Sequence, residues 1–111
     1  MAASDYQVKI EVDNGVIVCN VKDGKVKGGN IVVRATDTNT IQFIGNGVQF
    51  GLSFVSFPDG ATEWPFVDAA PSWPVPQFKG VLKPVASGTY YKYAVSVVGA
   101  PPLDPIIIVD K

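Results

Sequence analysis

The stretch YQVKIEVDNGVIVCNV, residues 6–21, decides the fold class. Residues 6–12 alternate strictly between apolar and polar side chains. Successive side chains of a strand point to opposite faces, so this period of two predicts a strand with one buried and one solvated face. Residues 13–15, Asp-Asn-Gly, tolerate the positive φ of a tight turn, and residues 16–21 return as an apolar strand. The stretch therefore predicts a β-hairpin.

The rest of the chain has the composition of a strand protein. Its 111 residues include eighteen valines and eight isoleucines but three leucines. β-Branched side chains favour strands over helices. Glycines and prolines interrupt the apolar runs every eight to twelve residues or so, which is typical of a sandwich or barrel. Further strands are expected at residues 31–35, 41–44, 48–57, 81–85, 90–98 and 106–109.

The length is that of one domain. We predict a single all-β domain over residues 1–111, folded as an antiparallel Greek-key β-sandwich of seven to eight strands. Residues 58–80 break the strand pattern, because five prolines fix φ and remove backbone donors there. We expect a long irregular loop rich in proline and tryptophan, with at most short edge pairings, of a kind that is often functional.

The end of the chain resembles that of the cupredoxins. In that family, a strand starting Gly-Thr-Tyr leads to an aromatic residue, the copper-ligand cysteine, a histidine, a methionine and a final β-branched strand. Here Gly-Thr-Tyr-Tyr-Lys-Tyr-Ala, residues 88–94, precedes the closing strand at 106–109. The resemblance implies a cupredoxin-like fold. The Gly-x-Tyr element also occurs in the tyrosine corner of immunoglobulin-like sandwiches, which are the alternative fold.

The copper ligands of that family are missing. Ala94 occupies the cysteine position, Val97 stands about where the histidine would be, and the only methionine is Met1. A blue-copper site needs two histidines and a cysteine, and this chain has no histidine at all. The resemblance therefore implies the fold without electron transfer, and we expect no metal and no cofactor.

Composition also restricts the chemistry. Without histidine, the usual general base and the commonest metal ligand are both missing, which excludes His-dependent hydrolase triads. The single cysteine, Cys19, lies in the middle of an apolar strand and is expected to be a buried, inert thiol. We therefore expect a protein that is not an enzyme.

The aromatic residues of the 58–80 loop are the first candidate site. Both tryptophans lie there beside prolines, and flat rings held in this way can stack on a ligand or a partner. Two carboxylates flank them as candidate hydrogen-bond acceptors. The other interpretation is that the rings cover an open part of the sandwich and belong to the core. The candidate ligand- or partner-binding residues are Trp64, Phe66, Trp73, Phe78, Glu63 and Asp68.

Three functions follow, in order of preference. We favour a non-enzymatic protein-binding or assembly module without a metal site. The alternative is a carbohydrate-binding module that stacks sugars on Trp64 and Trp73. A cofactor-free hydrolase using Glu63 or Asp68 ranks last, because a glycosidase needs two carboxylates across a cleft and most acids here sit in turns.

Charge and hydropathy restrict partners and location. Arg34 is the only arginine and the net charge is −1, so nucleic acid is not an expected partner. No apolar run approaches the roughly 18 residues of a membrane helix. The start lacks the basic and apolar regions of a signal peptide, which predicts a cytoplasmic protein. An exported protein whose signal had been replaced by a methionine would begin in the same way.

Self-association is also expected. Only 17% of the residues are charged, which leaves more apolar side chains than a thin sandwich readily hides. If Ile106 and Ile108 face the core, Ile107 faces outward. We expect Ile107 to join Tyr90, Val98 and Val55 in an apolar patch that supports a homodimer or a larger assembly.

Overall fold

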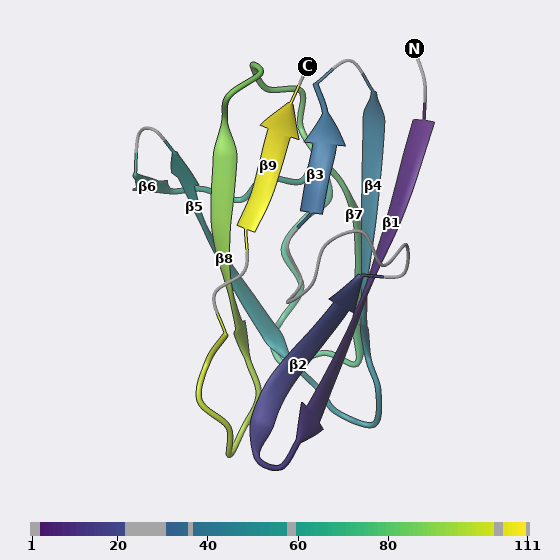
Figure 1. Ribbon diagram of the computed structural model, residues 1–111, viewed down its shortest axis with the longest axis vertical. Coiled ribbons are helices and arrows are strands. Elements are labelled where there is room, and N and C mark those ends of the chain that lie inside the picture. Colours follow the sequence, from purple (N-terminus) through teal and green to yellow (C-terminus); the bar gives the residue numbers. More distant parts are fainter. Residues whose placement is uncertain (1–2, 22–30, 36, 58–59, 104–105, 111) are drawn as a thin grey trace.

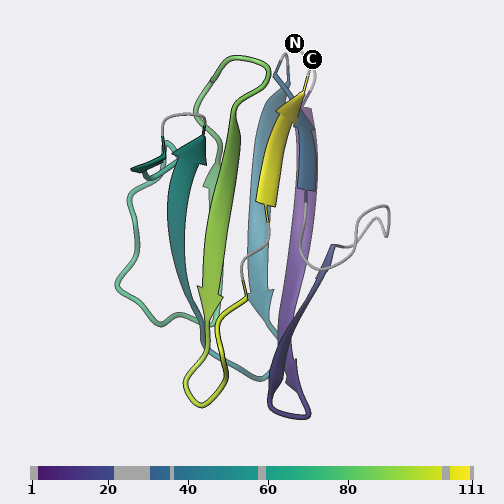
Figure 2. The same ribbon diagram turned by 60° about the vertical axis from the view of Figure 1, so that its left-hand side comes forward.

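The computed structural model describes residues 3–21, 31–35, 37–57, 60–103 and 106–110. Within these residues the chain forms strands and no helix, which confirms the predicted all-β class. The strands lie in two layers (Figures 1 and 2). They are β1 (Ala3–Asp13), β2 (Val16–Val21), β3 (Ile31–Arg34), β4 (Thr38–Gly45), β5 (Gly51–Phe57), β6 (Ala61–Thr62), β7 (Gln77–Val81), β8 (Tyr90–Ser96) and β9 (Ile106–Asp110).

The strands form a four-stranded sheet, in the order β2-β1-β4-β7, and a five-stranded sheet, in the order β3-β9-β8-β5-β6. Most neighbouring pairs are antiparallel, but β1 runs parallel to β4 and β3 runs parallel to β9. The prediction of antiparallel pairing was therefore wrong for these two pairs. The period of two in a strand specifies which residues face the core, and it carries no information about the direction of the strand beside it.

The predicted hairpin is confirmed. β1 and β2 pair antiparallel, with Asp13 opposite Val16. The two turn residues, Asn14 and Gly15, have φ of 52° and 77°. A two-residue turn with positive φ at both positions matches the right-handed twist of the strands it joins, which is why Asn-Gly is favoured there.

The predicted loop at 58–80 contains more strand than expected. β6 lies inside it, and β7 begins at Gln77 and ends at Val81, whereas a strand was predicted at 81–85. β7 is an edge strand of the four-stranded sheet and pairs only with β4. A short edge strand tolerates prolines directly before it, so the proline content obscured its start.

One apolar core lies between the two sheets. Alternate residues of the strands point into it, including Val8 and Ile10 of β1 and Tyr91, Tyr93 and Val95 of β8. These inward residues are almost fully buried. The two packed faces thus account for the alternation seen in the sequence.

The expected outward position of Ile107 was wrong. Ile107 is 0% exposed and lies opposite Tyr91 of β8 and Ile31 of β3, which are also buried. A run of three isoleucines is compatible with either phase of the strand, and pairing with β8 selects the phase that buries Ile107. A lysine at position 107 would therefore place a charge in the core.

Candidate functional site

The aromatic segment between β6 and β7 closes one side of the molecule. It runs along the β5 side of the molecule (Figure 2). Just before β5, Phe50 and Val75 exchange two backbone hydrogen bonds of 2.9 and 3.0 Å. On its other side, the N–H of Val67 donates to the carbonyl oxygen of Val81 at 2.8 Å. The segment thereby links the start of β5 in one sheet to the end of β7 in the other.

Phe66 and Phe78 belong to the core. Their rings meet in an edge contact with centroids 5.4 Å apart, and Phe66 also packs on Phe43 and Phe54. Phe66 is 1% exposed and Phe78 is 9% exposed. Neither ring presents a face to a ligand. For these two residues, the structure agrees with the interpretation that the loop aromatics cover the core.

Trp64 and Trp73 are half-buried at the outside of the same cluster. Their ring centroids lie 6.2 Å apart with the planes tilted by 58°. Both rings also contact Phe78, and the indole N–H of Trp64 donates to the carbonyl oxygen of Asp68 at 2.5 Å. The two indoles therefore offer no shared plane on which a sugar ring could stack.

The two acidic candidates lie on the surface with different partners. One carboxylate oxygen of Asp68 accepts a hydrogen bond from the N–H of Val81 at 2.7 Å, which ties the aromatic segment to the end of β7. Glu63 is exposed, and its negative charge adds to the effect of burial in raising the pKa of Tyr91. The structure therefore places Asp68 in a structural role and gives no sign that the two acids act as a pair.

Cys19 is buried in the core, as predicted. Burial raises the pKa of its thiol to about 11, because the thiolate would lose its hydration there. A thiol with a raised pKa is a poor nucleophile at neutral pH. Across the described residues, no group of three or more His, Cys, Asp or Glu side chains could hold a metal ion.

The outer face of the four-stranded sheet is polar. Gln7 on β1 donates to Gln42 on β4 at 3.4 Å, and Glu11 accepts from Asn20 and Asn46 at 3.4 and 3.0 Å. These side chains form cross-strand hydrogen bonds on a solvated surface. This face is that of an ordinary water-exposed sheet.

The outer face of the five-stranded sheet is different. Along β5 and β8, the outward side chains are mostly small or apolar, and Lys92 is the only charged residue among them. Phe57 and Tyr90 stack with ring centroids 4.8 Å apart and planes 6° apart. Beside this pair lies a shallow groove of about 290 Å³. We call this surface the β5–β8 face; its outward residues are Gly51, Ser53, Val55, Phe57, Tyr90, Lys92, Ala94 and Ser96.

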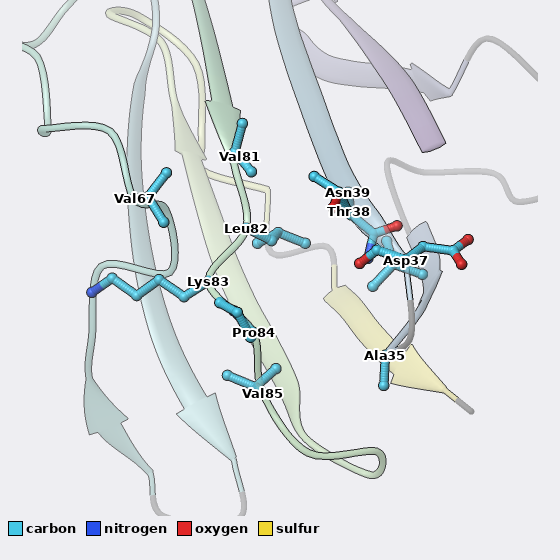
Figure 3. Close-up of a pocket in the computed structure, with 11 residues that line it drawn as sticks. Ala35, Asp37, Thr38, Asn39, Val67, Val81, Leu82, Lys83, Pro84 and Val85 are labelled. Carbon is cyan, nitrogen blue, oxygen red and sulfur yellow. The ribbon is translucent and has the colours of Figure 1, made fainter. Parts of the chain in front are cut away.

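A deeper cleft of about 530 Å³ opens between the β3–β4 turn and the residues that follow β7. Figure 3 shows its two walls, with residues 81–85 and Val67 on one side and Ala35, Asp37, Thr38 and Asn39 on the other. Leu82 points between them. The walls are largely apolar, and Asn39 at the start of β4 is the buried polar residue among them.

Sequence reasoning missed this cleft because its walls come from segments far apart in the chain. One local signal existed. Asn39 shares the inward phase of β4 with Ile41 and Phe43, so a polar residue occupies a core position of a strand. Buried polar side chains of this kind require a partner, and they mark places where a strand does more than pack.

The comparisons with known proteins assign no family. No protein-family model matches the chain, and no curated protein matches it. In the part of the chain that the structure describes, no helix is long and apolar enough to cross a membrane.

Proposed function

We propose that this protein is a non-enzymatic assembly module that associates with a second copy of itself through the β5–β8 face. The observation that carries the proposal is the contrast between the two outer faces. The four-stranded sheet presents hydrogen-bonded amides and a carboxylate, whereas the β5–β8 face presents stacked aromatic rings with one charge.

The contacts of the β5–β8 face suit an interface core. The Phe57–Tyr90 stack supplies rigid apolar area, and Tyr90 is 37% exposed. Aromatic residues are enriched and charged residues depleted at the centre of protein interfaces. Val55 lies next to this stack along β5 and opposite Lys92 of β8. A symmetric dimer would place the apolar rows of the two copies together, and the aliphatic stem of Lys92 would add apolar area beside Val55.

We also infer that the two sheets form a Greek-key sandwich of the cupredoxin-like kind without the copper site. Support comes from the C-terminal strands, because Tyr90 opens β8 after Gly88 and β9 then pairs antiparallel with β8. The chain also changes sheet five times, between β2 and β3, β3 and β4, β4 and β5, β6 and β7, and β7 and β8. The positions equivalent to copper ligands hold Ala94 and Val97.

Carbohydrate binding at Trp64 and Trp73 stays a prediction that the geometry does not favour. The tilt of 58° between the indole planes prevents the pair from acting as one platform. Titration with sugars, followed by tryptophan fluorescence, would reveal binding if either ring nevertheless stacks on a sugar.

The assembly proposal is tested by light scattering over a dilution series. We expect a mass above that of one chain at micromolar concentration and a decrease on dilution. Val55→Lys places a second charge beside Lys92 and should dissociate the assembly without unfolding the chain. Val16→Lys is the matched control, because Val16 is 53% exposed on β2 of the other sheet.

Two results would contradict the proposal. The mass of a single chain at every concentration would exclude self-association. An assembly that survives Val55→Lys, or that Val16→Lys dissociates equally well, would place the interface elsewhere. Circular dichroism of both variants shows whether each remains folded.

A further inference from the structure

We propose that the cleft between the β3–β4 turn and residues 81–85 binds a small neutral molecule with an apolar body and one N–H or O–H donor, which bonds to the side-chain oxygen of Asn39. This ligand site shares no residue with the β5–β8 face, so the two proposals can be tested independently.

The nitrogen of the Asn39 side-chain amide makes two hydrogen bonds. Its nitrogen donates to the carbonyl oxygens of Arg34 and Asp37, at 2.9 and 3.3 Å. Exchanging the amide nitrogen and oxygen would place an acceptor against two carbonyl oxygens, so the assignment follows from the hydrogen bonds. The backbone oxygen of Asn39 is also occupied, because it accepts from the N–H of Leu82 at 2.9 Å.

The side-chain oxygen of Asn39 differs from the nitrogen in this respect. The oxygen Oδ1 of Asn39 has no hydrogen-bond partner within the described structure, although the residue is only 5% exposed. Buried side-chain oxygens are almost always hydrogen-bonded, because losing contact with water without a replacement is unfavourable. Since the nitrogen is committed to the backbone between β3 and β4, Oδ1 is the remaining hydrogen-bonding atom of this side chain, and Asn39 is one of the residues that line the cleft.

The surroundings of this oxygen define the rest of the ligand. Val33 and Leu82 are buried apolar residues that line the cleft, and Val85, which also lines it, is half-buried. The volume of about 530 Å³ lies within the usual range of small-molecule sites. Asp37 and Lys83 carry opposite charges on opposite walls of the cleft (Figure 3), so neither sign is favoured. An apolar, uncharged body with a single donor matches this arrangement.

The probes that test the proposal are indole and benzothiophene, which have nearly the same shape but differ in the N–H donor. Each is titrated into the ¹⁵N-labelled protein and followed by amide chemical shifts. We expect indole to produce saturable shifts at the side-chain amide of Asn39 and at the backbone of Leu82 and Val85. Benzothiophene should bind about tenfold more weakly, because it leaves Oδ1 unpaired.

Three variants locate the site. Val85→Phe fills the cleft without touching Asn39 and should abolish the indole shifts. Val16→Phe makes the same change on β2, away from the cleft, and should leave indole binding unchanged. Asn39→Leu removes the acceptor and should make the two probes bind equally. If loss of the bonds to Arg34 and Asp37 unfolds that variant, Val85→Phe and the pair of probes still decide the matter.

Several results would overturn the proposal. Equal affinity of indole and benzothiophene for the native protein would show that no donor is recognised. Absence of saturable shifts at the cleft, or binding unaffected by Val85→Phe, would show that the cleft is not the site. Saturable shifts with a valine-rich peptide, but none with indole, would indicate a peptide groove instead.

Discussion

Gly80 lies where two aromatic rings leave no room for a side chain. A Cβ atom there would lie 2.7 Å from the Cδ1 atom of Phe66 and 3.0 Å from the Phe78 ring. Both rings are fixed in the aromatic cluster, so neither can move aside without losing contacts. The ring of Phe66 can therefore pack against β7 because position 80 has no side chain.

We expect Gly80→Ala to destabilise the protein by about 1–3 kcal/mol, the usual cost of overpacking a core. Urea unfolding followed by tryptophan fluorescence measures the change. Gly51→Ala is the matched control, because its Cβ would lie an ordinary 3.6 Å from Trp73. A Gly80→Ala variant as stable as the native protein would show that the aromatic cluster yields easily.

Burial of the Cys19 thiol makes the free energy of unfolding depend on pH above neutrality. The pKa of its thiol is about 11 in the folded protein against 9.0 as the ordinary value. Between these values the folded state holds a proton that the unfolded state has lost, so stability must fall as pH rises above 9. Burial also raises the pKa values of Tyr91 and Tyr93, which act in the same direction.

We expect the urea midpoint to be constant near neutral pH and to decrease from pH 9 upward. A Cys19→Ala variant should begin at lower stability, because it loses buried volume, and should show a shallower decrease. A midpoint that rises between pH 9 and 11 would contradict the raised pKa. Labelling with a thiol reagent at pH 8 provides a second measurement and should require unfolding.

At the scale of elements, the segment between β6 and β7 owes its position to a few polar contacts. The Asp68 carboxylate holds the N–H of Val81, and the backbone oxygen of Asp68 holds the indole of Trp64. These two bonds connect the aromatic cluster to the end of β7. An irregular segment with many prolines has few ladder hydrogen bonds of its own, so such contacts determine where it lies.

Asp68→Ala should therefore loosen this segment, with a loss of about 1 kcal/mol in stability. The sharper measurement is hydrogen exchange, in which the amide of Val81 should lose protection while the amides of β1 and β2 keep theirs. Asp68→Asn is the control, because its side-chain oxygen can still accept the bond. Unchanged protection at Val81 in the alanine variant would show that the carboxylate does not hold the segment.

At the scale of the whole molecule, the two sheets have unequal outer surfaces. Both contribute inward faces to one core, yet their outer faces differ: side chains of the four-stranded sheet bond to one another across β1, β2 and β4, whereas the β5–β8 face is mostly small or apolar. The β5–β8 face and the cleft beside Asn39 are formed by different surfaces. The assembly test and the probe titration therefore report on separate properties of the same fold.

Much of this architecture was predictable from the sequence. Alternation at 6–12, Asn-Gly at 14–15 and the richness in β-branched residues determine the hairpin, the all-β class and the inward phase of β1. Burial of Cys19 follows from the same local pattern. These features depend on residues close together in the chain, where turn geometry and side-chain periodicity act directly.

The remaining features needed the tertiary structure. The parallel pairs β1–β4 and β3–β9, the inward phase of Ile107 and the burial of Phe66 depend on which distant strands become neighbours. The candidate sites depend on the same choice, because the cleft joins residues of β3 and the start of β4 with residues 81–85, and the β5–β8 face joins strands more than thirty residues apart. A period of two specifies the two faces of a strand, whereas only packing of the whole chain determines which face meets the core and which strand lies alongside.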